Sequence, residues 1–402
     1  MQRIALLALA ASLALPAAAG EEFAPEASLI LQGQYRRTKD VPERAISGYW
    51  SAGHDHGASR RLTFDDSELV AGARLGGSAR AQLNLAWHDN KVEVEEAWLQ
   101  ALGLGNGFTL KGGRFLSGIG YLNEQHSHAW DFADAPLMSK ALFGEHFAQD
   151  GLQLKWVAPT ELFVELGAEV GRGNAFPGAG SKGAAAFFAH AGDDVGLSHA
   201  WRAGLSWLDS RAKGREGHFE DTDPLGPNEV AGRFSGRSRT VAADFVWKWA
   251  PDGNPRYRNF KIQAEVFRRT ESGDLACVSD VATSPCLGGL ALGSLRSVQT
   301  GGYAQAVWQF MPQWRAGYRY DRLNAGAKSY DAATAFAALD PANAYFSRHR
   351  PTRHSLMLDW SQDEFSLLRL QLARDKSMPG VTDNQLTLQY IVSFGAHGAH
   401  KF

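Results

Sequence analysis

The chain is poor in cysteine, in charge of one sign and in long apolar runs. Its 402 residues include only 2 cysteines, and 41 Lys and Arg nearly balance 43 Asp and Glu, for a formal net charge of -2. No tract is basic enough to indicate a nucleic-acid partner. After residue 20, no run approaches the roughly 18 apolar residues of a transmembrane helix. These absences argue against a nucleic-acid-binding protein and against a helical membrane protein.

The first residues have the order of features of a secretory signal peptide. Arg3 gives a positive start, residues 4–15 are apolar, and residues 17–19 are three alanines. The apolar stretch is too short for a stop-transfer helix, and the alanines suit a cleavage site of the A-x-A kind. A buried N-terminal helix is the alternative, which this order of features disfavours. We expect residues 1–19 to be a signal peptide for Sec export and residues 20–402 to form one domain.

The rest of the chain alternates apolar residues with polar or small ones in segments of about ten, which is the period of a strand with one apolar face. An exported chain without a membrane helix is either soluble in the periplasm or a closed barrel. Sixteen strands are predicted, at residues 28–37, 67–75, 79–88, 92–102, 108–115, 151–157, 161–172, 184–191, 197–209, 238–250, 259–270, 297–311, 314–323, 352–361, 364–375 and 384–394.

The connections between these strands alternate in length. Every second one is short, for example 76–78, 158–160 and 312–313. Apart from 89–91, the others are long: 38–66, 116–150, 173–183, 210–237, 271–296 and 324–351. Outer-membrane barrels have short turns on the periplasmic side and long loops outside. The sequence therefore predicts a 16-stranded antiparallel transmembrane β-barrel that resides in the cell outer membrane of a Gram-negative bacterium.

The polar face of each strand would then line a water-filled lumen. Positive and negative residues on this face nearly balance, and generic wetting of the lumen explains them as well as a specific site does. The residues expected to line the lumen are Arg36, Arg80, Glu96, Lys111, Arg114, Asp244, Lys261, Glu265, Arg315, Arg319 and Asp321.

The third connection on the outer side, residues 116–150, is the predicted constriction loop. Its Trp, Phe, Leu and Met residues are too apolar for a freely solvated loop, so we expect it to fold against the inner wall of the barrel. Its acidic residues would favour cations if they face the pore. The residues expected to act there are Tyr121, Glu124, His126, His128, Asp131, Asp134 and Glu145.

Three stretches around this loop resemble a known porin family. The strand Val94-Glu95-Glu96-Ala97-Trp98-Leu99 is similar to the one before the constriction segment of the phosphate-selective porin O/P family. Lys111-Gly112-Gly113-Arg114-Phe115, followed by Tyr121-Leu122-Asn123-Glu124, is similar to the entry into that segment, and Gly151-Leu152-Gln153-Leu154 to its exit. The resemblance covers about residues 92–156 and implies a 16-stranded, trimeric porin with the third loop inside. No ladder of lysine and arginine carries over phosphate specificity.

A closer resemblance, over residues 113–136 and 393–402, is to small histidine-containing outer-membrane proteins labelled zinc-regulated or TonB-dependent receptors. Paired histidines could chelate zinc, because residues i and i+2 of an extended chain point to one side. Solvated loop histidines are the alternative, and no cofactor is required. The metal candidates are His54, His56, His126, His128 and His146.

The two cysteines and the C-terminus add two smaller predictions. Cys277 and Cys286 are expected to form a loop disulfide in an oxidising compartment, rather than a metal pair, because no histidine or third cysteine lies beside them. The last strand ends in an aromatic residue, as barrel-assembly machinery usually requires. That residue is Phe394, or Phe402 if the strand runs on.

Three functions remain open. A passive channel for small hydrophilic solutes or ions accounts for the strand count, the loop alternation and the third loop. A metal-linked uptake protein would use the loop histidines. A barrel hydrolase, with His126 beside Asp131, lacks a nucleophile motif, so we expect no enzyme. The expected partners are outer-membrane lipid, lipopolysaccharide, the barrel-assembly machinery and two further copies of the chain in a homotrimer.

Overall fold

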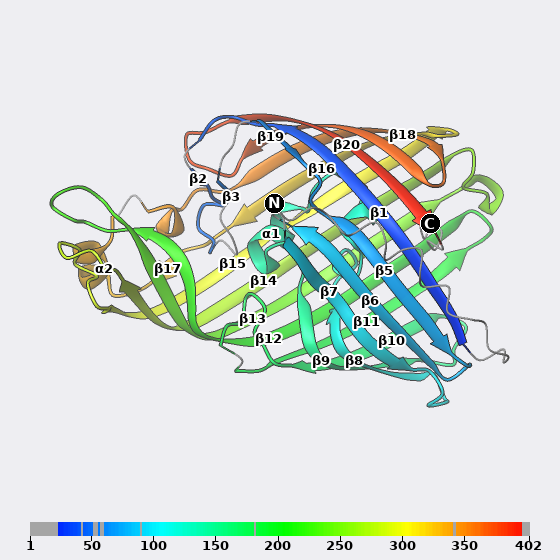
Figure 1. Cartoon of the computed structure of the whole chain (residues 1–402), viewed down its shortest axis with the longest axis horizontal. Coiled ribbons are helices and arrows are strands. Elements are labelled where there is room, and N and C mark those ends of the chain that lie inside the picture. Colours follow the sequence, from blue (N-terminus) through cyan, green and yellow to red (C-terminus); the bar gives the residue numbers. More distant parts are fainter. Residues whose placement is uncertain are drawn as a thin grey trace, which may run out of the picture.

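Strands run along most of the chain in the computed structural model, which describes residues 23–41, 43–50, 55–56, 60–88, 91–180, 182–340 and 343–395. Its main sheet has 18 strands, of which β4 (Arg60–Thr63) and β17 (Lys328–Ser329) are short additions beside β1 and β15. The other sixteen go around a barrel, and β20 pairs with β1 to close it (Figure 1). The predicted 16-stranded antiparallel β-barrel is thus confirmed.

Each predicted strand has a counterpart in the barrel. In chain order these are β1 (Phe23–Arg37), β5 (Ser67–Leu75), β6 (Ala79–His88), β7 (Lys91–Ala101), β8 (Phe108–Leu116), β9 (Ala148–Val157), β10 (Phe163–Gly171), β11 (Ala184–Val195), β12 (His199–Glu220), β13 (Glu229–Trp249), β14 (Asn259–Val278), β15 (Leu290–Met311), β16 (Trp314–Asn324), β18 (Thr352–Asp363), β19 (Ser366–Lys376) and β20 (Asp383–Gly395).

The helices and remaining short strands lie in the connections. They are the pair β2 (Glu43–Arg44) and β3 (Asp55–His56), the helices α1 (Leu137–Phe143) and α2 (Ala332–Ala338), and the 3-10 turns η1 (Ser127–Ala129), η2 (Pro251–Gly253) and η3 (Ala344–Phe346). Within the described part of the chain, no helix combines the length and the apolar character needed to cross a bilayer.

Side chains alternate across the wall as the sequence predicts. On β14, Ile262 and Val266 are 38% and 56% exposed on the outer face, whereas Gln263 and Glu265 are buried on the inner one. Successive residues of a strand point to opposite faces of the sheet, so an alternating sequence turns one apolar face outward. The barrel is therefore inverted relative to a soluble protein, with its polar side chains inside.

The strands β12 to β15 are much longer than predicted. The expected loops 210–237 and 271–296 are wrong, because β12 continues to Glu220, β13 begins at Glu229, β14 continues to Val278 and β15 begins at Leu290. Phe219, Phe234, Leu275 and Leu295 on these extensions are buried in one cluster with Trp50, Leu339 and Tyr345. Packing against loops that fold into the barrel stabilises the strand pairing of these extensions, although their polar composition indicates a loop.

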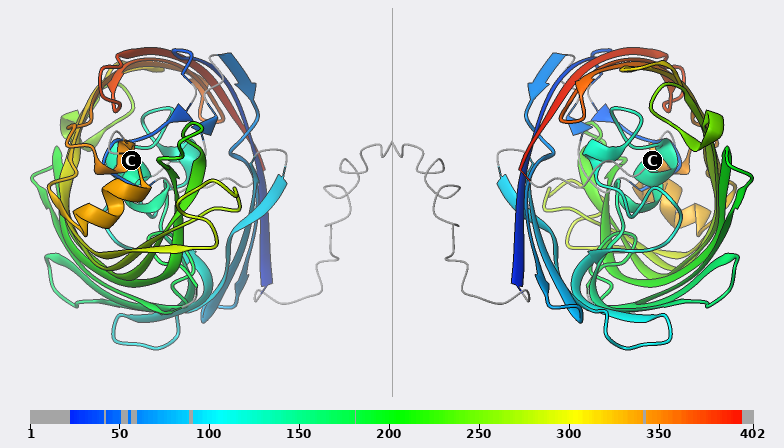
Figure 2. Two further views of the ribbon diagram at one scale, coloured as in Figure 1. Left: turned by 90° about the vertical axis from the view of Figure 1, so that its left-hand side faces the viewer. Right: turned by 90° about the vertical axis from the view of Figure 1, so that its right-hand side faces the viewer.

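Two segments occupy the interior at different levels. Views along the barrel show the teal α1 and the orange α2 within the ring of strands (Figure 2). The segment containing α2 packs in the cluster at the extended ends of β12–β15, where these strands are joined in hairpins. The loop containing α1 packs on Phe267 and Tyr303, deeper in the barrel. The expected signal peptide, residues 1–19, and the tail to Phe402 lie outside the described residues.

Candidate functional site: the constriction loop and its docking walls

The constriction loop, taken here as residues 117–147, folds into the barrel between β8 and β9. Leu122, Trp130, Met138 and Leu142 are buried in a cluster that includes wall residues. The helix α1 follows Pro136 and ends at Gly144, whose φ of 74° is the left-handed conformation that favours glycine at a helix end. The apolar content noticed in the sequence thus anchors the loop inside the barrel.

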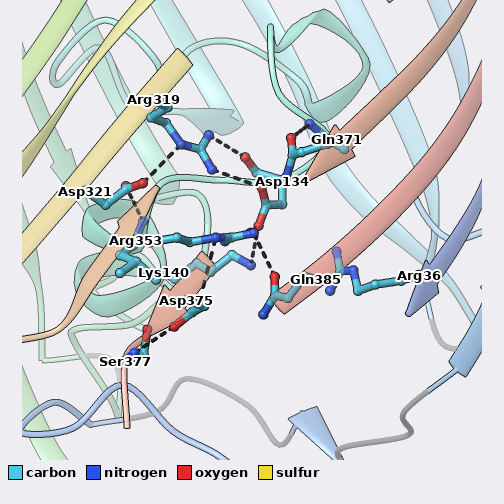
Figure 3. Close-up of polar contacts among 12 residues, drawn as sticks. Arg36, Asp134, Lys140, Arg319, Asp321, Arg353, Gln371, Asp375, Ser377 and Gln385 are labelled. Carbon is cyan, nitrogen blue, oxygen red and sulfur yellow. Dashed lines mark hydrogen bonds and ion pairs between the residues drawn. The ribbon is translucent and has the colours of Figure 1, made fainter. Parts of the chain in front are cut away.

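Asp134 fixes the loop to one side of the barrel (Figure 3). Its carboxylate accepts hydrogen bonds from Arg319 Nη2 and from Gln371 Nε2, both at 2.9 Å, and from Arg353. Lys140 Nζ lies 3.4 Å away. Burial alone would raise the pKa of Asp134, but the surrounding Arg353, Lys140 and Arg319 hold it well below its usual range. The carboxylate is therefore an ionised, buried contact.

Asp131 makes the same kind of contact three residues earlier in the loop. It is ion-paired with Lys261 and lies 3.4 Å from Arg315 Nη1, and Gln305 Nε2 donates a hydrogen bond of 2.9 Å to it. These wall residues lie on β14, β15 and β16, and β16 also carries Arg319, a partner of Asp134. We call Lys261, Arg315, Arg319 and Arg353 the basic wall.

His126 and His128 face an opposite set of charges on β5 and β7. His126 Nδ1 lies 3.0 Å from Glu95 Oε2, and its Nε2 lies 3.1 Å from Glu96 Oε2. His128 Nδ1 lies 2.9 Å from Glu68 Oε1. Burial would lower the pKa of His126, but its hydrogen bonds to these carboxylates raise it well above its ordinary value. We call Glu68, Glu95 and Glu96 the acidic wall.

A β-bulge makes the acidic wall possible. The register of β6 and β7 shifts so that Asn84 pairs with Glu96 and Leu85 with Val94, which leaves Glu95 as an extra residue. Two neighbouring residues of a regular strand point to opposite faces, whereas a bulge re-aims one of them. Both carboxylates consequently reach into the lumen.

The remaining loop residues make separate contacts. Glu124 Oε1 is 2.8 Å from Lys155 Nζ, and the ring of Tyr121 lies 5.3 Å from the guanidinium of Arg202. Glu145 makes a long contact of 4.0 Å with Lys140, and its side chain is 42% exposed. The ring of His146 packs 4.9 Å from that of Trp130.

Ten of the eleven residues expected in the lumen lie on inward-facing positions of their strands. Arg114 does not: it pairs with Ala97 on the outer face, three residues from the inward Lys111, and its Nε lies 3.1 Å from Asp150. An odd spacing in a regular strand reverses the face, so both residues cannot line the lumen. The inward ones are Arg36, Arg80, Glu96, Lys111, Asp244, Lys261, Glu265, Arg315, Arg319 and Asp321.

Loop carboxylates do not supply a free negative lining of the kind expected. Asp131 and Asp134 are each 6% exposed and are paired with the basic wall, and Glu124 is paired with Lys155. A carboxylate that is neutralised by a basic partner attracts cations in the pore only weakly, and so it contributes little to ion selectivity. Among these loop carboxylates only Glu145 keeps an exposed, weakly paired side chain.

Of the five histidines considered for metal binding, His126 and His128 lie together with their rings stacked 5.9 Å apart, and the ring of His146 packs on Trp130. His54 lies outside the described residues, and the side chain of His56 is also outside them. Among the described residues, the group able to hold an ion is instead Glu68, Glu95 and His126, whose ligand atoms all lie within 4.8 Å of one another. Glu68 and Glu95 were not among the predicted site residues, and the only signal for Glu95 was that it and Glu96 are adjacent glutamates in a predicted strand.

The cysteines lie at the tip of the long β14–β15 hairpin. Cys277 and Cys286 form a disulfide with their Cα atoms 5.4 Å apart, and both are fully buried in the cluster that contains Trp50.

Comparison with known proteins identifies the fold but not a family. No family model matches the chain. An uncharacterized protein of Aquifex aeolicus is 29% identical over 409 residues, which cover 94% of this chain and 80% of that protein. The family expected from residues 92–156 therefore stays a prediction.

Solved structures of outer-membrane proteins share the architecture. A loop-deletion mutant of Vibrio cholerae OmpT, an outer membrane protein, superposes with a TM-score of 0.56 at 11% identity, covering 93% of this chain and all of its own. DcaP of Acinetobacter baumannii, an outer membrane channel, gives 0.51 at 13%, covering 94% and 99%. The chain is an outer-membrane β-barrel located in the cell outer membrane.

Proposed function

We propose that this barrel is a porin that lets small hydrophilic solutes or ions diffuse passively across the outer membrane. The observation that carries the proposal is the constriction loop, docked inside a closed barrel of sixteen strands by charged contacts on two walls. Barrels of this size enclose an aqueous lumen, and an inward loop sets its width.

The same contacts argue against catalysis. His126 pairs with Glu95 and Glu96, whereas Asp131 pairs with Lys261 and Arg315 on the basic wall. A hydrolytic pair needs its base held by its own carboxylate and beside a nucleophile. The two residues suggested for such a pair are engaged with different strands, so we propose a channel without enzymatic activity.

Recording from single molecules in a planar bilayer tests the proposal. Stepwise conductance from the purified protein is expected, and its absence at all voltages would overturn the channel function. A reversal potential measured across a salt gradient then gives the ion preference, which the paired loop carboxylates no longer bias toward cations.

Assembly belongs to the same proposal. A trimer form of Vibrio cholerae OmpT, with a TM-score of 0.53 at 10% identity, supports a homotrimer here. We propose that lipopolysaccharide phosphates bind a hollow lined by Arg211, Lys213 and Arg237 on the extended strands β12 and β13 and by Lys182 just before β11, because clustered basic side chains suit phosphate groups. We also propose that β20 is read by the barrel-assembly machinery. Cross-linking in membranes tests the trimer, and a dominant monomer would contradict it.

Metal-linked uptake remains the second candidate function. The grouping of Glu68, Glu95 and His126 favours it, in place of the paired histidines first considered.

A further inference from the structure

We infer that Glu68, Glu95 and His126 form a site for one divalent transition-metal cation, of which Zn²⁺ is the representative, between the acidic wall and the constriction loop. Two ligands come from strands and one from the loop. A cation held there ties the loop to the wall opposite the basic one.

The three ligand atoms already converge. His126 Nδ1 lies 3.0 Å from Glu95 Oε2 and 3.6 Å from Glu68 Oε2, and the whole set spans less than 4.8 Å. Ligand atoms that each lie about 2.0–2.2 Å from one zinc ion are separated from one another by distances close to those found here. The ion therefore needs only small movements of side chains, with no change in the barrel wall.

The other polar atom of each ligand is held by a partner. Glu96 binds Nε2 of His126 at 3.1 Å, and His128 binds the second oxygen of Glu68 at 2.9 Å. A metal-binding histidine almost always donates its second ring N–H to a carboxylate or carbonyl, which fixes the tautomer and the ring orientation. The arrangement at His126 matches this pattern and leaves Nδ1 for the ion.

Asn84 supplies an independent observation. Its side chain is 0% exposed, its Nδ2 lies 2.8 Å from Glu68 and 3.2 Å from His126 Nδ1, and its Oδ1 has no hydrogen-bond partner. A buried polar atom without a partner is costly and calls for an explanation. Rotating the amide of Asn84 by half a turn places Oδ1 where Nδ2 now lies, facing Glu68 and His126. An oxygen there is unfavourable beside two carboxylates, but it is favourable beside a cation.

The donor set indicates the class of ion. Two carboxylate oxygens and one imidazole nitrogen suit Zn²⁺ and its neighbours, whereas Ca²⁺ and Mg²⁺ take oxygen ligands almost alone. The competing explanation is a network of protonated histidine and carboxylate that needs no metal. The two differ in whether the protein binds the ion with a stoichiometry of one.

Calorimetric titration of the full-length barrel, purified in detergent without lipopolysaccharide and treated with chelator, distinguishes them. One Zn²⁺ is expected to bind per chain, and Ca²⁺ and Mg²⁺ to compete poorly. Glu95→Gln and His126→Gln are each expected to weaken binding by roughly a hundredfold, since even outer partners of a metal contribute about 10- to 100-fold. Glu165→Gln is the matched control, because Glu165 also pairs with a lumen histidine, His190, at 3.1 Å.

Folding of each variant is checked by heat-modifiable electrophoretic mobility. Absence of Zn²⁺ binding to the wild-type barrel overturns the inference, as does binding that survives both ligand variants or falls equally in the control. Preference for Ca²⁺ or Mg²⁺ overturns the assigned class of ion. Conductance in chelator separates this inference from the channel proposal, because a barrel that conducts but binds no metal refutes only the site.

Discussion

Release of the constriction loop should follow from one substitution at Asp134. The variant Asp134→Asn keeps the shape of the side chain and removes the charge that Arg319 and Arg353 share. The side chain of Asp134 is only 5% exposed, so these contacts are not screened as surface ion pairs are. We expect the loop to undock from the basic wall in a fraction of molecules.

The size of the effect follows from the contacts that remain. Removing one partner of a buried ion pair costs about 3–5 kcal/mol. Arg319 keeps Asp321 at 3.2 Å and Arg353 keeps Asp375 at 3.7 Å, which places the expected loss near the lower end. About 3 kcal/mol shifts the ratio of docked to undocked loops by roughly a hundredfold.

Single-channel recording measures the result. We expect Asp134→Asn to show larger or noisier conductance steps than the wild type, with a lower melting temperature. Glu145→Gln is the control, since Glu145 lies on the same loop with only a 4.0 Å contact to Lys140. If Asp134→Asn conducts and melts like the wild type and this control, Asp134 does not hold the loop, and the account of the basic wall is wrong.

Three further results are expected. The double substitution Cys277→Ser and Cys286→Ser should weaken the β14–β15 hairpin by about 2–3 kcal/mol. We expect faster proteolysis of this hairpin and an unchanged melting temperature of the barrel, and proteolysis at the wild-type rate would contradict this. Gly167→Val should lower the melting temperature, because a Cβ at Gly167 lies 2.0 Å from the ring of Phe188; an unchanged value would show that the ring moves freely. The depressed pKa of Asp134 makes its contribution present above the ordinary aspartate value of about 3.9 and lost as the pH falls through the lower folded value. Conductance steps should therefore keep their size from pH 7 to about 5, and a rise within that range would count against the Asp134 contact.

Local alternation was enough to predict the strands of the barrel. β5 and β6 begin and end at the predicted residues, because their alternation is bounded by clear turns. The extensions of β12 to β15 were missed, since charged residues such as Arg215 indicate solvent and become buried only through contacts with distant segments. No local pattern carries that information.

The docking of the constriction loop was predicted only in part. Its apolar residues indicated burial, but the pairing of Asp131 and Asp134 with basic side chains on three strands depends on how the barrel closes. The grouping of Glu95 with Glu96 depends on a bulge, which changes the face of one residue without a mark in composition. The contacts that could not be predicted from the sequence are thus those between residues far apart along the chain.

The bulge in β7 also means that the lumen can be altered by deletion without rebuilding the wall. Glu95 is the unpaired residue, so removing it joins Val94 to Glu96 in a regular ladder. Val94 would stay opposite Leu85 on the lipid side, and Glu96 would stay opposite Asn84 inside. A single-codon deletion would remove one carboxylate from the acidic wall and leave every other residue of the strand on its present face. In most strands the same deletion would invert half of the alternation, so this position offers a rare way to change the contents of the barrel while preserving its frame.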